Sequence, residues 1–166
     1  MDLILTGGRV IDPSQHLDAI VEVGFAGGKV AAVAKSIPRA PETTVKDVSG
    51  LIVTPGLIDM HTHVYWGGTS LGIDAEDFCR RSGVTTSVDT GSAGPGNFAG
   101  FRTHVIEKSA VRILPYLHIS HAGIYGLDYG LEVGESENLR LMNPAAAIDV
   151  VEANRDLIVG MKVRVG

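Results

Sequence analysis

The sequence has little that points outside the reducing interior of a cell. Cys79 is the single cysteine among 166 residues, so no disulfide can form within the chain and an oxidising compartment receives no support. The N-terminal segment MDLILTGGRV has an acidic second residue and a short apolar run, which fits neither a signal peptide nor a membrane span. We therefore expect a cytoplasmic protein without a membrane partner.

Aromatic residues and basic clusters are also scarce. Aromatic residues make up 5% of the chain, and 14 basic against 19 acidic side chains give a formal net charge of -5. Nucleic-acid binding leaves a clustered basic footprint, so no nucleic-acid partner is expected. What is abundant is glycine, with 21 residues, beside 7 prolines and 45% hydrophobic residues. This composition predicts a folded chain with many tight turns.

Hydrophobic patterning divides the chain near residue 54. Before that point, short apolar segments recur about every ten residues with turn signals between them, which is typical of small antiparallel sheets. The expected strands are residues 3–5, 10–11, 19–23, 29–33 and 45–48. Residues 1–54 are therefore predicted to form the N-terminal part of a small β-sandwich domain.

From residue 55 onward, apolar strands alternate with helical segments, which predicts an α/β fold built from βα units. The capping residues Asp74 and Asn143 and the stop residue Gly83 mark helix ends. Strands are expected at residues 52–64, 85–89, 111–120 and 157–165, and helices at residues 72–82, 97–108 and 144–155. Four such strands make the N-terminal half of a (β/α)8 TIM barrel, whose active sites lie at the carboxyl ends of the strands. Residues 55–166 are thus expected to be its first four βα units, truncated.

Two histidines stand at the end of the first of these strands, in the run LIVTPGLIDMHTHV. Side chains on a strand alternate between faces, so Leu57, Asp59, His61 and His63 are expected to point the same way. Neutral imidazole is a common metal ligand, and this pair would form half of a divalent-metal site. The alternative is a pair of core or surface histidines that bind nothing.

A lysine interrupts the apolar last strand, LIVGMKVRVG. An interior lysine is expected to lose its charge, find a partner or be chemically converted. A neutral Lys162 amine can add carbon dioxide to give a carbamate, whose two oxygens can bridge two cations. The alternative is a lysine that extends from an edge strand into solvent.

Polar residues also stand at the ends of the two middle strands. Asp89, His118 and Ser120 are predicted to approach the same rim as supporting or substrate-facing groups. The glycine-rich loop of residues 91–100 is interpreted as a mobile loop that could offer backbone donors to a substrate carboxylate. A mononuclear site of His61, His63 and His118 is a further alternative.

Three motifs in combination, GGRVIDP, PGLIDMHTH and GMKVRVG, resemble the amidohydrolase superfamily, in its dihydroorotase-like branch that includes amidohydrolase/deacetylase metalloenzymes. The resemblance implies two divalent metal ions, by default zinc, although manganese or iron suits such a site. His61 and His63 would bind the more buried metal, and an N-carboxylated Lys162 would bridge both. It also implies hydrolysis, by metal-activated water, of an amide, cyclic amide or acyl ester in a small carboxylate-bearing substrate.

The sequence departs from the family pattern in two places, and each departure limits what the resemblance implies about activity. Dihydroorotases typically have a carboxylate-binding arginine two residues after the second histidine, where this chain has Tyr65. Dihydroorotase activity proper is therefore disfavoured, and the segments HVYWGGTSLG, SVDTGSAG and LHIS resemble the deacetylase-type subgroup. Tyr65 is expected to support the metal ligands or to face the substrate.

The second departure concerns the later strands of the family barrel, which supply two more histidines and the general-base aspartate. These would lie beyond Gly166, so the chain is expected to be an N-terminal portion that is incompetent alone. The alternative is a non-catalytic half-barrel that needs a partner chain, or a homo-oligomer joined through its exposed sheet edges.

Overall fold

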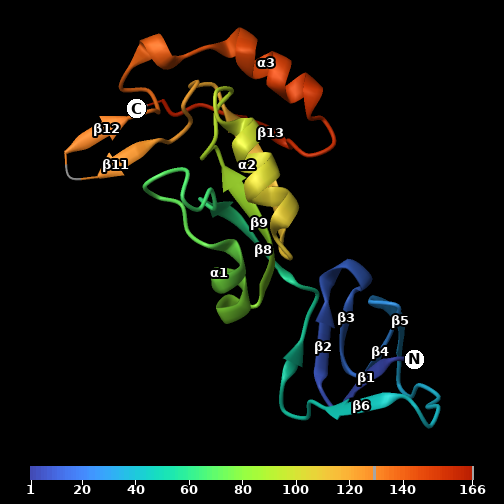
Figure 1. The fold of residues 1–166 in the computed structure, drawn as a ribbon. Helices are drawn as coiled ribbons and strands as arrows, with labels where there is room; N and C mark the ends of the chain where they lie inside the picture. The colour runs from blue at the N-terminus through green and yellow to red at the C-terminus, as the bar shows by residue number, and fades with distance from the viewer. Residues whose placement is uncertain (129, 166) are drawn as a thin grey trace. The chain divides into compact units, whose positions relative to one another are not determined.

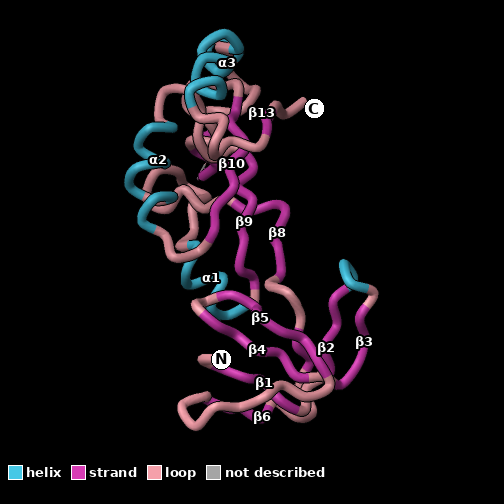
Figure 2. The backbone as a smooth tube through the Cα atoms, turned by 90° about the vertical axis from the view of Figure 1, so that its right-hand side faces the viewer, coloured by secondary structure: helices cyan, strands magenta, loops and turns pink. Residues whose placement is uncertain are grey.

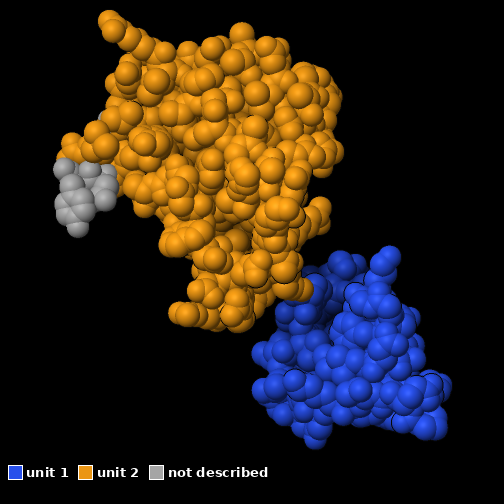
Figure 3. Space-filling view, viewed as in Figure 1, with its two compact units in different colours: residues 1–55 blue, residues 56–166 orange. Residues whose placement is uncertain are grey.

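The computed structural model describes residues 1–128 and 130–165. The chain forms two compact units, one from Met1 to Pro55 and one from Gly56 onward, which Figure 3 colours separately. The break falls at the Pro55-Gly56 dipeptide, a strong interruption of any strand. Each unit has its own sheets. None of the helices in the described ranges is long and apolar enough to cross a membrane.

The first unit contains two small sheets. One has the strand order β5-β4-β1-β6 and the other the order β3-β2-β7. In the first sheet β1 pairs antiparallel with β4 and parallel with β6. The bounds are β1 (Leu3–Thr6), β2 (Arg9–Asp12), β3 (Leu17–Ile20), β4 (Glu22–Ala26), β5 (Lys29–Ala34), β6 (Thr44–Asp47) and β7 (Ile52–Val53), with a 3-10 turn at Pro13–Gln15. The all-β character agrees with the sequence pattern, while sandwich packing stays a prediction.

Two predicted strands are each divided in the structure, and the strand expected over residues 157–165 is confined to Gly160–Lys162. The predicted strand 19–23 is two strands, because β3 ends at Ile20 and β4 begins at Glu22 in the other sheet. The predicted strand 52–64 is also two strands. Its first residues form β7 beside β2 in the first unit, and the rest forms β8 (Leu57–Thr62) in the second unit. Hydropathy alone cannot show where a continuous apolar run changes its partner.

The second unit is built on a parallel four-stranded sheet with the order β13-β10-β9-β8. Its strands are β8, β9 (Val84–Thr90), β10 (Arg112–His118) and β13 (Gly160–Lys162), and its α-helices are α1 (Ala75–Ser82), α2 (Phe98–His104) and α3 (Pro144–Ala153). Figure 1 labels β13, β9 and β8, and Figure 2 labels all four strands. Short 3-10 turns follow at Ile106–Lys108 and Leu139–Leu141. The predicted α/β fold with a parallel half-barrel sheet is therefore confirmed. A hairpin of β11 (Gly126–Asp128) and β12 (Leu131–Val133) was not predicted.

Helix ends follow the capping signals. The Asp74 carboxylate accepts the backbone N–H groups of Glu76 and Asp77, and Gly83 closes α1 in the left-handed conformation. The Asn143 side chain caps α3 in the same way, by accepting the N–H of Ala146. The helix expected over residues 97–108 is shorter than predicted, because α2 ends at His104 and continues as a 3-10 turn.

The core of the second unit lies between the sheet and its helices, which follow one side of the strands in Figure 2. Phe98 and Phe101 of α2 are fully buried against Ile113 and Leu117 of β10. Burying such side chains is worth roughly 1.5–3 kcal/mol each. This packing fixes which face of each strand is turned away from the helices, and that face carries the candidate site.

Candidate metal centre

His61, which lies in β8, and His63, which follows the last residue of that strand, lie side by side. Their ring centroids are 5.5 Å apart with the ring planes at 75°. His61 is exposed and His63 is half-buried. A β-bulge between Asp59 and Thr62 breaks the regular alternation, and the Asp59 carboxylate accepts the N–H of His61 at 3.0 Å. The prediction that Asp59 points the same way as His61 and His63 is therefore wrong.

His61 and His63 line one cavity with Lys162 of β13, at the carboxyl ends of the strands. The cavity has a volume of about 430 Å³. Glu135 and Arg164 line it too, and the sequence analysis did not include them as site residues. Glu135 is 2% exposed and accepts a hydrogen bond from Arg164 Nη1 at 2.5 Å. Its position after the unpredicted β11–β12 hairpin explains why no local motif indicated it.

Asp89 stands at the end of β9 and is fully buried. Its Oδ2 accepts the N–H of Val64 at 2.8 Å, while Oδ1 accepts the N–H groups of Gly91 and Ser92 at 3.1 and 2.8 Å. The N–H groups of Gly91 and Ser92 were expected to face a substrate carboxylate, and in the structure they are donated to Asp89 instead. The start of the 91–100 loop is buried and hydrogen-bonded, and its mobility stays a prediction.

Asp89 and His118 both stand near the carboxyl ends of their strands, as predicted, but they lie on opposite faces of the sheet. Asp89 is in register with Pro115, three residues before His118, and paired residues of parallel strands point the same way. His118 is in register with Lys162 instead. An odd offset along a strand reverses the face, so only His118 lies on the face of the lysine.

The ring of His118 is fully buried, and among the described residues one of its two nitrogens has a hydrogen-bond partner. Its Nδ1 accepts the N–H of Ser120 at 2.9 Å, and its Nε2 has no partner among the described residues. The neutral ring therefore carries its proton on Nε2, where a metal would need a lone pair. The Ser120 hydroxyl is likewise buried without a partner in the described part of the chain.

A mononuclear site of His61, His63 and His118 is not formed. Within residues 1–128 and 130–165, no three side chains of His, Cys, Asp or Glu come together closely enough to hold a metal ion. The chain instead offers two imidazoles and a lysine around one cavity. Imidazole nitrogen with oxygen from a lysine carbamate is a donor set that suits zinc.

Electrostatics on this face favour neutral imidazoles. Burial lowers the pKa of His63, with Asp89 acting in the opposite direction and His61 and Lys162 in the same direction. Burial also lowers the pKa of His118. The pKa of Asp89 is raised by its burial, against the opposing effect of its hydrogen bonds from Val64 and Ser92. A neutral imidazole is the form that binds a cation.

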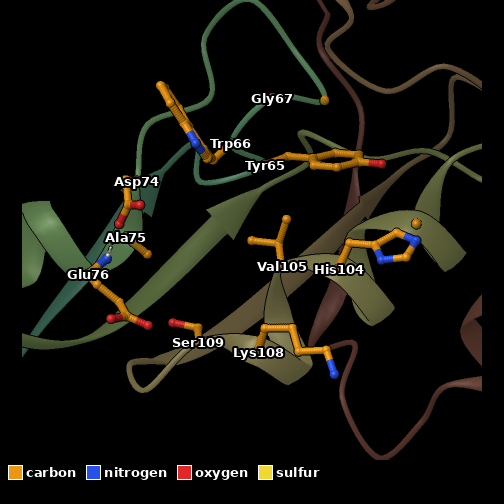
Figure 4. Close-up of a pocket in the computed structure, with 12 residues that line it drawn as sticks. Tyr65, Trp66, Gly67, Asp74, Ala75, Glu76, His104, Val105, Lys108 and Ser109 are labelled. Atoms are coloured by element: carbon orange, nitrogen blue, oxygen red, sulfur yellow. Dashed lines mark hydrogen bonds between the residues drawn. The ribbon is translucent and has the colours of Figure 1, made fainter.

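Tyr65 lies away from the histidine cavity. Its ring stacks on Phe101 at 4.6 Å, and its hydroxyl donates to the carbonyl of Asn97 at 3.3 Å. It lines a separate cavity of about 410 Å³ beside His104 and Lys108 (Figure 4). Tyr65 therefore does not line the cavity of His61 and His63, and its role as a supporting or substrate-facing residue stays a prediction.

Curated relatives match this chain over part of their length. No protein-family model matches it. A deacetylase of Agrobacterium fabrum is 35% identical over 137 residues, which is 82% of this chain and 33% of that protein. A deacetylase of Brucella anthropi is 33% identical over 151 residues, 90% of this chain and 37% of its own length. A dihydroorotase of Syntrophus aciditrophicus is 48% identical over 65 residues, 39% of this chain and 15% of that protein. The chain spans about a third of the length of the two deacetylases.

Solved structures agree with this picture. The crystal structure of a dihydroorotase superposes with a TM-score of 0.85 at 30% identity, covering 98% of this chain and 42% of that one. The crystal structure of an adenine deaminase gives a TM-score of 0.71 at 25% identity, covering 98% of this chain and 41% of that one. Both units of the chain therefore have counterparts in these proteins.

Proposed function

Because the chain belongs to the amidohydrolase superfamily and matches N-terminal parts of its dihydroorotase-like and deacetylase members, we propose that it supplies the first ligands of a metal-dependent hydrolase. His61, His63 and Lys162 are the proposed ligands. The observation that carries the proposal is their common cavity, with the two imidazole rings 5.5 Å apart. The neutral state favoured for His63 supports it further.

Each proposed ligand has a distinct task. The imidazoles of His61 and His63 would bind one cation through a ring nitrogen, and Lys162, as a carbamate, would offer one oxygen to each of two cations. Zinc is the proposed metal. Divalent cations held in this way supply the charge that lowers the pKa of water and polarises a carbonyl oxygen. Glu135 and Arg164 place a paired negative and positive charge at the cavity wall.

The proposed reaction is hydrolysis of an amide, cyclic amide or acyl ester in a small carboxylate-bearing molecule. A deacetylase reaction is favoured over that of a dihydroorotase proper. Among the curated relatives, the deacetylase matches extend over 137 and 151 residues and the dihydroorotase match over 65, although the dihydroorotase crystal structure superposes on 98% of this chain. Tyr65, in place of the expected arginine, also supports this choice. A cytoplasmic location stays a prediction.

Association through the sheet edges is proposed alongside this function. β8 and β13 are the edge strands of the second unit. Leu57, Ile58 and Met60 of β8 are each more than half exposed, and Met161 of β13 is 41% exposed. Unpaired edges with apolar side chains invite pairing with another segment or copy.

Calorimetric titration of the 166-residue chain with Zn²⁺ and Mn²⁺ tests the metal proposal. We expect Zn²⁺ binding that is lost in His61→Ala and His63→Ala. His121→Ala is the matched control, because His121 is exposed and does not line the cavity. Sedimentation of the same samples shows whether the metal-binding species is a monomer or an associated form. Equal Zn²⁺ affinity in all variants would refute the assignment.

A further inference from the structure

Arg164 brings a guanidinium group to the cavity of the two histidines. It lies two residues after Lys162 and lines the cavity together with His61, His63 and Lys162. Its Nη1 donates to Oε2 of Glu135 at 2.5 Å, and the two side chains are 54% and 2% exposed. The pair therefore has a carboxylate enclosed by protein and a guanidinium that is open to the cavity.

Two consecutive residues hold Arg164 in place. Glu135 accepts a hydrogen bond from its side chain, and the Ser136 hydroxyl donates one to its backbone carbonyl. Both contacts come from the segment that follows β12, and they join residues 29 and 28 positions apart in the chain. A side chain that is already fixed loses little further freedom when a ligand binds, so its contacts with the ligand contribute more to affinity.

Most of the guanidinium remains available for hydrogen bonds. An arginine has five N–H donors in a planar fork, and the hydrogen bond to Glu135 uses one nitrogen, Nη1. Arg9 shows the contrasting case, because its Nε and Nη2 donate to the two carboxylate oxygens of Asp18. In Arg164 these two nitrogens have no hydrogen-bond partner among the described residues. A carboxylate is the group that two parallel N–H donors recognise.

The formal charges around the cavity favour a ligand with one negative charge. With an unmodified lysine, the positive groups of Lys162 and Arg164 face the single carboxylate of Glu135, which leaves one positive charge uncompensated. Tyr65 stands where dihydroorotases typically have a carboxylate-binding arginine, and it lines the other cavity. Among the described residues that line the histidine cavity, Arg164 is the single arginine.

We propose that Arg164 is a specificity residue that binds the carboxylate of the substrate through Nε and Nη2. It selects carboxylate-bearing esters and amides over neutral molecules of the same shape. The assignment of this carboxylate to a substrate rests on the function proposed above, whereas the binding of a small carboxylate at Arg164 does not.

NMR titration of the 166-residue chain with N-acetylglycine, at pH 8 without added metal, tests the proposal. N-acetylglycinamide is the matched neutral probe, because it differs in lacking the carboxylate. We expect saturable binding of N-acetylglycine and much weaker binding of the amide. Arg164→Gln should weaken N-acetylglycine binding by about 10-fold or more, the loss typical of a hydrogen bond to a charged group. Arg164→Lys keeps the charge without the fork and should recover the affinity only in part.

Arg155→Gln is the matched control, because Arg155 also forms an ion pair with a glutamate, Glu152, but does not line the cavity. It should leave N-acetylglycine binding unchanged. The proposal is overturned if the unsubstituted chain does not bind N-acetylglycine, if it binds the amide equally well, or if Arg164→Gln binds as tightly as the unsubstituted chain. A loss in Lys162→Gln that Arg164→Gln does not share would place the carboxylate at the lysine and overturn it as well.

Zinc titration of the unsubstituted chain separates this inference from the proposed function. If the chain binds zinc while N-acetylglycine binding is independent of Arg164, the inference fails and the metal function stands. If the chain binds no zinc while N-acetylglycine binding depends on Arg164, the metal function fails and the carboxylate site stands.

Discussion

The carboxylate of Asp89 accepts the backbone N–H of Val64 at 2.8 Å, and this bond joins the end of β9 to the residue that directly follows His63. The same carboxylate also orders the first residues of the next loop through Gly91 and Ser92. One buried side chain thus sets the backbone on both sides of the candidate centre. Its contribution should be measurable without any metal or substrate.

Asp89→Asn should lower the free energy of unfolding by about 1–3 kcal/mol, since either orientation of the amide turns its NH2 group towards a backbone N–H. Urea unfolding at pH 7 measures the change. Ser87→Ala is the control, because Ser87 shares the strand, the face and full burial, yet among the described residues its hydroxyl has one hydrogen-bond contact, with the Cys79 sulfur at 3.5 Å. Its loss should cost less than about 1 kcal/mol. Equal losses in the two variants would contradict the role given to Asp89.

Gly91→Ala should disturb the lysine side of the cavity. Gly91 has φ of +93°, and a Cβ there would lie 2.8 Å from Lys162 Cγ and 3.3 Å from His118 Cδ2. Backbone strain of this kind costs about 1–3 kcal/mol, and the contact with Lys162 adds to it. Gly28→Ala is matched for strain alone, because Gly28 has φ of +73° and open space around it.

The two glycine variants should differ in stability and in zinc affinity. Thermal unfolding should show a larger loss for Gly91→Ala than for Gly28→Ala, and calorimetry should show weaker zinc binding only for Gly91→Ala. If both variants bind zinc as the unsubstituted chain does, the close approach of Gly91 to Lys162 has no bearing on the site.

Stability should fall as the pH decreases below neutrality. Burial lowers the pKa of His118 below its ordinary 6.5, so the unfolded chain binds a proton that the folded chain rejects. Stability is complete above pH 6.5 and declines below it until the folded pKa is reached, with a limiting slope of about 1.4 kcal/mol per pH unit for one histidine. His63 acts in the same direction. The raised pKa of Asp89 has the opposite effect on stability. Above pH 3.8 the folded chain holds a proton that the unfolded chain loses, so this contribution falls as the pH rises.

Comparison of His118→Gln with the unsubstituted chain isolates one of these contributions. Urea unfolding between pH 8 and pH 5.5 should give a shallower decline for His118→Gln, because glutamine does not titrate. His104→Gln is the control, since His104 is exposed on α2. Identical pH profiles for all three proteins would show that the buried ring of His118 titrates normally.

Local patterns in the sequence predicted those features that depend on a few neighbouring residues. Asp74, Asn143 and Gly83 marked helix ends because a cap is satisfied within one turn. The alternation of apolar strands and helices predicted the parallel sheet, because strands and helices differ in the spacing of their hydrophobic residues. The spacing of His61 and His63 placed both rings side by side, because residues two apart on a strand share a face.

The sequence by itself determined the βα order, the caps and a pair of histidines at a strand end, all through short-range periodicity. Tertiary structure decided what surrounds them. The bulge after Asp59, the register that separates Asp89 from His118, the Ser92 contact to His63, and the approach of Glu135 and Arg164 all depend on which strands and turns pack together. Such contacts join residues distant in the chain, and their geometry is fixed by packing and hydrogen bonding across strands rather than by the residues next to them.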